Sequence, residues 1–145
     1  PDGARGDAEG EGSESRLLMP VGLKYVVMLF GAVCIAIGMT HILIGPSSIP
    51  GSVPVNATMD SEDRFYATLF VGFGAALSWC ARDLGERGRL FLWLMVLFFC
   101  TGLARLVSIA QVGLPHPLFQ FLGAVELFLP LILWFWHHKA YAPPR

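Results

Sequence analysis

Four long apolar runs, separated by proline-rich or charged segments, make up most of the chain. A helix rises about 1.5 Å per residue, so about 20 residues cross the roughly 30 Å hydrocarbon layer of a bilayer. The runs predict membrane-spanning helices over about 23–44, 61–80, 90–110 and 118–136. Stretches such as RLFLWLMVLFFC lack the polar face that a helix of a soluble bundle requires. We therefore expect an all-α fold, namely an integral membrane four-helix bundle.

The segments outside these runs divide the chain into a membrane domain and two tails. Residues 1–21 are largely polar, acidic and rich in glycine, and we expect them to be disordered because they bury too little apolar surface to offset ordering. Residues 22–138 form the predicted four-span domain, and residues 139–145 form the C-terminal tail. The first connecting segment, IGPSSIPGSVPVNATMDSED, is long and partly apolar, so we expect it to lie across the end of the bundle.

Composition supports lipid as the surrounding medium. Hydrophobic residues make up 54% of the chain and charged residues 14%, whereas about a quarter of the residues in soluble domains are charged. A net charge of −1 and the lack of a basic patch exclude nucleic acid as a partner. The three cysteines form no CxxC pair, and no metal-binding, cofactor or catalytic motif stands in the sequence. We therefore expect no metal and no cofactor.

The positions of lysine and arginine predict the orientation, because these residues gather on the cytosolic side of membranes. Four crossings would place the N-terminal tail, the second connecting segment and the C-terminus on one side. That side collects most of the basic residues: Arg5, Arg16, Lys24, Arg82, Arg87, Arg89, Lys139 and Arg145. We expect both termini in the cytosol, or in the matrix if the membrane is organellar.

Ionisable residues at bilayer depth are costly and usually face the bundle interior. They are His41, Arg64, Arg105 and Glu126, with Asp60, Glu62 and Asp63 at the rim. Asp60 is also the expected N-cap of the second helix. Arg105 lies about 12 Å from the turn at Gly113, and Glu126 about 15 Å from the same end, counted along the helices. We expect these two to pair, and the whole group to share the outer half of the bundle.

Several interpretations of this group remain open. It could be a structural clamp that fixes the register of the helices, a ligand pocket, or a path for protons or ions. A metal site is the least expected of the alternatives, since one histidine and one deep carboxylate supply too few ligands.

Small residues at helical spacing predict how the helices pack, since they let backbones approach closely. In the first span they are Gly31, Cys34 and Gly38. In the second span we expect Thr68, Gly72 and Ala76 to face a neighbouring helix, and in the fourth span Gly123.

Three phrases of the sequence carry a family resemblance: GMTHILIGPSSIPGSVPVNATMDSEDRFYATLFVGFG, GLARLVS and VGLPHPLFQFLGAVELFLP. Together they resemble the small four-span membrane family catalogued as domain of unknown function 4345. The resemblance covers roughly residues 22 to 138. The matching elements are His41, residues 60–66, Gly102 with Arg105, the GLP turn and Glu126. It implies a fold and a membrane location, a bacterial plasma membrane in preference to an organelle, and no particular reaction.

Three functions are compatible with these features. The first is an accessory or scaffold subunit of a larger membrane assembly, whose partners would be other membrane proteins or further copies of the chain. The second is a binder or carrier of a lipid or quinone-like amphiphile in an outer-half pocket. The third is a membrane-embedded enzyme that uses Glu126 or His41 as a general acid or base. The sequence shows no evident nucleophile for such an enzyme. We expect the first, and we regard an enzyme as the weakest of the three.

Overall fold

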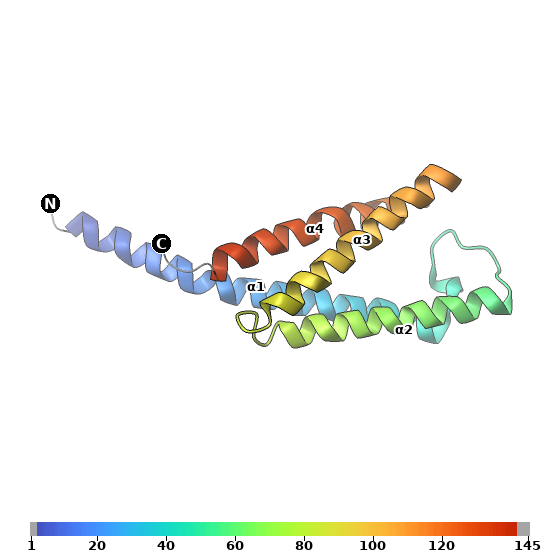
Figure 1. The fold of residues 1–145 in the computed structure, drawn as a ribbon, viewed down its shortest axis with the longest axis horizontal. Helices are drawn as coiled ribbons and strands as arrows, with labels where there is room; N and C mark the ends of the chain where they lie inside the picture. Colours follow the sequence, from blue (N-terminus) through green and yellow to red (C-terminus); the bar gives the residue numbers. More distant parts are fainter. Residues whose placement is uncertain (1–2, 142–145) are drawn as a thin grey trace.

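The computed structural model describes the backbone of residues 3–141 and the side chains of residues 20–141. Its four α-helices are α1 (Gly3–Ile44), α2 (Ala57–Cys80), α3 (Gly88–Val112) and α4 (Pro117–Tyr141), with a short 3-10 helix, Pro46–Ser48, after α1 (Figure 1). No strand occurs in the described backbone. The all-α prediction is therefore confirmed. Residues 3–21, which were expected to be disordered, belong to α1 in the described backbone, although the side chains of residues 3–19 are not described. Residues 142–145 lie outside the described backbone.

Three of the helical stretches are long and apolar enough to cross a membrane: Pro20–Ile44, Gly88–Val112 and Pro117–Tyr141. This finding supports a membrane protein. Helix α2 is long enough, with 24 residues, but it is not among the three candidates. Charged side chains in its first two turns, from Asp60 to Arg64, lower its apolarity. The prediction of a fourth crossing is therefore not supported by composition.

The start of α2 differs from the sequence-based expectation. The helix begins at Ala57 because Asn56 is the N-cap, and the Asn56 side chain accepts a hydrogen bond of 3.0 Å from the Met59 backbone amide. Asp60, the expected N-cap, lies inside the first turn instead. Asparagine and aspartate both suit the N-cap position, so residue type alone does not decide between Asn56 and Asp60.

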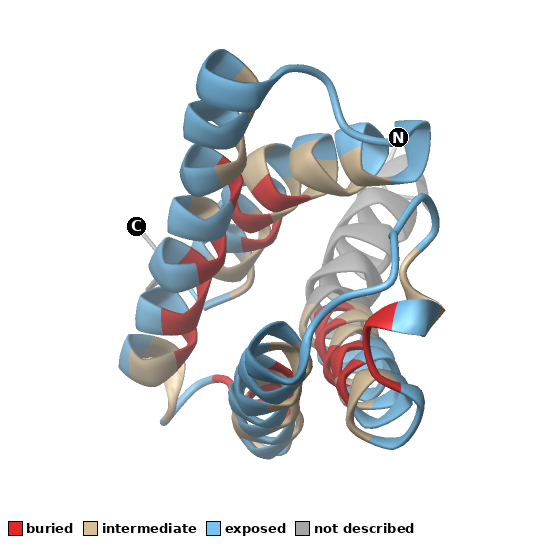
Figure 2. Cartoon of the chain, turned by 90° about the vertical axis from the view of Figure 1, so that its right-hand side faces the viewer, coloured by how far each residue is buried: buried red, intermediate tan, exposed pale blue. Residues whose placement is uncertain are grey.

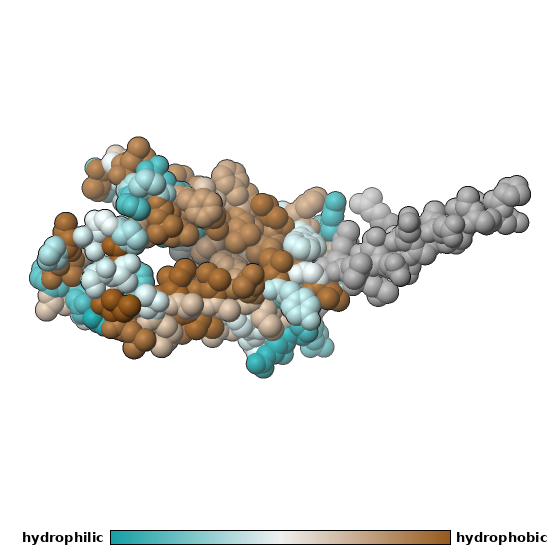
Figure 3. Space-filling model, turned by 180° about the vertical axis from the view of Figure 1, so that it is seen from behind, coloured by the Kyte–Doolittle hydropathy of each residue, from teal (hydrophilic) through white to brown (hydrophobic). Residues whose placement is uncertain are grey.

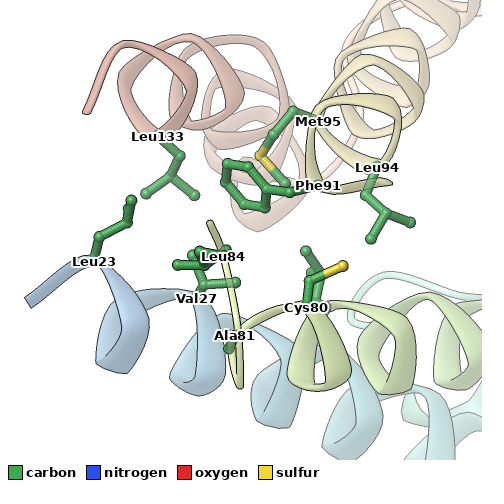
Figure 4. Packing of buried hydrophobic residues seen from close by; sticks show 10 residues of the cluster. Leu23, Val27, Cys80, Ala81, Leu84, Phe91, Leu94, Met95 and Leu133 are labelled. Carbon is green, nitrogen blue, oxygen red and sulfur yellow. The ribbon is translucent and has the colours of Figure 1, made fainter. Parts of the chain in front are cut away.

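Helices α1 and α2 form one hairpin, and α3 and α4 form a second (Figure 1). We call the end that carries residues 81–87 the hinge end, and the end that carries residues 45–56 and 113–116 the loop end. The largest buried cluster joins the two hairpins toward the hinge end. Its members are Leu23, Val27, Leu77, Cys80, Ala81, Leu84, Phe91, Leu94, Met95 and Leu133 (Figure 4).

Glycines set the distance between α1 and α2. A Cβ built on Gly38 would lie 2.8 Å from the Ala67 carbonyl oxygen, and a Cβ on Gly31 would lie 2.7 Å from that of Gly74. The small-residue stripe expected in α1 is thus the one that packs. The stripe expected in α2 is wrong at Thr68 and Gly72, which are exposed, since a Cβ built on Gly72 would meet no atom within 4 Å. Its third member, Ala76, does pack against the buried cluster, and Ala67 and Gly74 face α1.

Three phenylalanines connect the hairpins in the middle of the molecule. The Phe30 ring lies 4.9 Å from that of Phe98, and the Phe73 ring lies 5.6 Å from it, centroid to centroid. Beyond these rings the hairpins diverge toward the loop end (Figure 1). The space-filling view shows an opening between them there (Figure 3). We call it the interhelical opening.

The first connecting segment reaches the second hairpin at the loop end. Gly51, which has a positive φ of 82°, would place a Cβ 3.5 Å from the Cβ of His116 in the α3–α4 turn. The segment therefore reaches the α3–α4 turn at Gly51, whereas its apolar side chains Val53 and Val55 are exposed. Its contact with His116 bounds the interhelical opening on the loop side, as the Phe30–Phe73–Phe98 cluster bounds it on the hinge side.

Candidate functional site

Arg64 joins the first turns of α2 to the end of α1. Its Nε donates to Asp60 Oδ2 at 2.8 Å and its Nη2 to Asp60 Oδ1 at 3.1 Å, while its Nη1 donates to the Ile42 carbonyl oxygen. The last carbonyls of a helix lack partners within it, so this contact satisfies one of them. The guanidinium also holds the pKa of Asp60, at the rim, below its usual value through their hydrogen bond.

His41 and Asp63 form a second contact between the same two helices. The His41 Nδ1 lies 3.2 Å from Asp63 Oδ1, and the two side chains are 24% and 19% exposed. The other carboxylate oxygen, Oδ2, is buried and has no hydrogen-bond partner among the described residues. A buried acceptor without a donor is costly. The hydrogen bonding of the Asp63 carboxylate is therefore incomplete, whereas both oxygens of Asp60 accept from Arg64.

Arg105 and Glu126 pair between α3 and α4. The Arg105 Nε donates to Glu126 Oε2 at 2.7 Å. Glu126 is the one charged residue that is buried among the described side chains, with 7% of its surface exposed, whereas the Arg105 side chain is 38% exposed. The guanidinium also lies 5.6 Å from the Phe119 ring centroid. Gly123, the small residue expected to pack in the fourth span, lies against Arg105: a Cβ built on it would be 3.4 Å from Arg105 Cδ.

The helical register places these groups on the sides of the helices that face the bundle interior. Residues seven or eleven positions apart share one face of a helix. Arg105 lies seven residues beyond Phe98, and His41 lies eleven beyond Phe30, where both phenylalanines contact the opposite hairpin. Viewed from the loop end, buried and half-buried positions lie where the helices face one another (Figure 2).

The same register holds for α4. Glu126 lies seven residues before Leu133, which points toward Leu23 and Val27 of α1 (Figure 4). The inward faces of α1, α3 and α4 therefore carry apolar residues at the hinge end and ionisable residues in the half where the hairpins diverge.

The expected single group is divided into three separate contacts: Arg64 with Asp60, His41 with Asp63, and Arg105 with Glu126. The first two belong to one hairpin and the third to the other. Glu62 is exposed and makes no hydrogen bond or ion pair among residues 20–141.

One participant was missed from the sequence. The Ile42 carbonyl is a backbone group, which no side-chain motif marks.

Comparison with known proteins identifies the family. No curated protein and no solved structure matches the chain. The family described as "Domain of unknown function (DUF4345)" matches residues 22–137 of the 145. The matched region holds α2, α3, most of α4 and the apolar part of α1, together with all three ionic contacts. The resemblance drawn from the sequence is thereby confirmed, and the chain belongs to the DUF4345 family of domains of unknown function.

Proposed function

We propose that this protein binds a membrane amphiphile in the interhelical opening. The observation that carries the proposal is the divergence of the two hairpins beyond Phe30 and Phe98, in the half of the molecule where their inward faces bear ionisable residues. A void in a folded protein loses the contacts that its lining atoms would otherwise make. A molecule with an apolar tail and a polar head would restore contacts to both kinds of lining.

The proposal includes four membrane crossings. Helix α2 lies against α1 along most of its length, since Gly31 packs on Gly74, Gly38 on Ala67, and Arg64 binds the Ile42 carbonyl. This packing along α1, which is a candidate span, supports a crossing by α2 as well. The charged first turns of α2 then lie at the rim, where acidic and basic side chains reach the interface.

The proposal also includes an orientation with both termini on the cytosolic or matrix side. The hinge between α2 and α3 carries Arg82 and Arg87, and Arg89 follows at the start of α3. The loop end carries no lysine or arginine from Gly45 to Asp63 or from Gln111 to Gly123. This asymmetry supports an orientation with the loop end, and with it the interhelical opening, in the outer half of the membrane.

A bulky side chain placed in the opening tests the proposal. Ile37 lies seven residues beyond Phe30 on the same face of α1, and Ile37→Trp would reduce the space there. Met39→Trp is the matched control, because Met39 is similarly exposed but lies on the opposite side of the helix. Native mass spectrometry of protein purified in a mild detergent should find a bound amphiphile in the wild type and in Met39→Trp, and much less in Ile37→Trp. Equal retention in two folded variants would overturn the proposal.

A second candidate function is that of an accessory subunit. Three helical stretches are long and apolar enough to cross a membrane, so these helices offer a partner a long apolar surface. In that case a helix of the partner would occupy the interhelical opening. Purification from the native membrane would then return a second chain in fixed proportion, and Ile37→Trp would release it.

A further inference from the structure

We infer that Arg105 binds the head group of the amphiphile, and that the head group offers an uncharged carbonyl oxygen. The inference rests on the proposed binding in the interhelical opening and adds the chemical class of the ligand. It is carried by a difference between Arg64 and Arg105. All three guanidinium nitrogens of Arg64 donate hydrogen bonds, whereas only one nitrogen of Arg105 does.

Arg64 has all three of its guanidinium nitrogens engaged. Nε and Nη2 donate to the two oxygens of Asp60, and Nη1 donates to the Ile42 carbonyl. A guanidinium has five N–H donors in a planar fork, and each nitrogen of Arg64 uses at least one of them. The structure thus accounts for Arg64 as a clamp between α1 and α2.

Arg105 has one nitrogen engaged. Its Nε donates to Glu126 Oε2, and its Nη1 and Nη2 have no hydrogen-bond partner among residues 20–141. One N–H group from each of these two nitrogens points along the outer edge of the fork, and this edge can bind oxygen atoms side by side. Within a bilayer no bulk water satisfies such donors, so an acceptor at this position would be strongly favoured.

Arg105 is also restrained from turning toward the membrane surface. A long basic side chain near a helix end can extend to the interface and meet water or lipid phosphates there. Here the Nε of Arg105 is held at 2.7 Å from Glu126, which is buried, and Gly123 lies against its Cδ. The side chain is therefore held between α3 and α4, and an acceptor must come to it.

The charge of the pair defines the head group. The Glu126 carboxylate already neutralises the Arg105 guanidinium, so an anionic head group would add an uncompensated negative charge close to Glu126. A cationic head group would lie beside the N–H donors of Nη1 and Nη2 of Arg105, which offer it no hydrogen-bond acceptor. A carbonyl oxygen accepts two hydrogen bonds and carries no charge. An acyl ester and a quinone ring both offer one, and both would be attached to an apolar chain that fits the rest of the opening.

Binding of four probes in dodecyl maltoside, a detergent without carbonyl groups, tests the inference. Monooleoylglycerol carries an ester carbonyl, a decyl-substituted benzoquinone carries ring carbonyls, oleate carries a charge, and hexadecane carries no acceptor. Arg105→Lys keeps the positive charge beside Glu126 but loses the planar fork. Arg64→Lys is the matched control. We expect a carbonyl probe to bind the wild type and Arg64→Lys alike, and to bind Arg105→Lys about tenfold more weakly.

The outcomes separate the inference from the proposed function. The inference is supported if the quinone or the ester binds the wild type more tightly than oleate and hexadecane do, and if only Arg105→Lys loses that affinity. The tighter of the two carbonyl probes then identifies the source of the carbonyl. Tighter binding of oleate, or equal binding of all four probes by wild type and Arg105→Lys, overturns the inference while leaving an amphiphile site in place. Failure of every probe to bind overturns the proposed function as well.

A second variant guards against misfolding of Arg105→Lys. The combined change Arg105→Gln and Glu126→Gln replaces the ion pair with two neutral amides that can still hydrogen-bond to each other. It should unfold at nearly the wild-type temperature and bind the carbonyl probe more weakly. Wild-type affinity in this folded variant would overturn the role of Arg105.

Discussion

Gly74 of α2 faces Gly31 of α1 so closely that a Cβ built on Gly74 would lie 2.6 Å from the Gly31 carbonyl oxygen. Real side chains essentially never approach a backbone oxygen so closely, so the two helices can keep this separation only with glycine at both positions. The charged residues in the first turns of α2 make this helix less apolar than the other three. Its position in the bundle therefore depends mainly on its close packing against α1.

Replacement of Gly74 by alanine should therefore destabilise the protein. The added methyl group would force α1 and α2 apart, at a cost of about 2 kcal/mol in the free energy of unfolding. Gly72→Ala is the matched control in the same helix, since a Cβ at Gly72 would meet no atom within 4 Å. That change should be neutral or slightly stabilising, because alanine favours a helix over glycine. Unfolding by denaturing detergent measures both, and an equal effect of the two would contradict the described packing.

This comparison also marks what the sequence could not reveal. Helix α2 has small residues on two faces, Thr68 with Gly72 and Ala67 with Gly74, and periodicity alone does not say which face meets α1. The choice depends on where α1 lies, which is a tertiary relationship. The divergence of the hairpins has the same origin, because it depends on the contact of three phenylalanine rings from three different helices.

The pairing of Arg105 with Glu126, in contrast, could be predicted. Two helices joined by a short turn run antiparallel, so the distance of each residue from the turn fixes its depth. Arg105 and Glu126 lie at similar distances from the turn at 113–116, and an unpaired charge at that depth is costly. The pairing of Arg64 with Asp60, four residues earlier on the same helix, is open to the same kind of reasoning. The contact of Arg64 with the Ile42 carbonyl is not, because no side chain marks a backbone acceptor.

Removal of one partner of the Arg105–Glu126 pair should cost more than removal of both. Glu126→Leu leaves an uncompensated guanidinium beside a buried site and should lower the free energy of unfolding by about 3 kcal/mol. The double change Arg105→Leu and Glu126→Leu removes the charge and should recover most of that loss. Unfolding curves of the wild type, Arg105→Leu, Glu126→Leu and the double variant form a complete cycle. Additive losses would mean that the two side chains do not interact in the membrane.

Amphiphile retention in the same double variant separates structure from function. A pair that acts only as a clamp would leave retention unchanged in a stable double leucine variant. We expect retention to fall, because the donors of Arg105 are gone although the fold remains.

The position of α2 across the membrane can be tested with single cysteines. Val53 lies in the first connecting segment and Glu86 in the hinge, and both are exposed. Each would be changed to cysteine in a background in which Cys34, Cys80 and Cys100 are replaced by alanine. An impermeant thiol reagent should label Val53→Cys from outside intact cells and Glu86→Cys only in inverted vesicles. Labelling of both from one side would show that α2 does not cross.

A disulfide across the loop end should restrict access to the interhelical opening. A Cβ on Gly51 would lie 3.5 Å from the Cβ of His116, at the lower end of the range that a disulfide spans. We therefore expect Gly51→Cys with His116→Cys to cross-link under mild oxidation, which a change in gel mobility would detect. The cross-link should slow exchange of a bound fluorescent amphiphile, and reduction should restore the rate.

Two controls separate the effect of the cross-link from that of the substitutions. Gly51 has a positive φ, so Gly51→Cys alone carries a strain of about 1 kcal/mol without joining the hairpins. It should exchange the amphiphile at the wild-type rate, as should the reduced double variant. If the oxidised protein also exchanges at that rate, the amphiphile enters sideways from the bilayer between the two hairpins, and the contact between Gly51 and His116 does not control access. If exchange slows only in the oxidised form, the first connecting segment must move away from the α3–α4 turn each time a ligand enters.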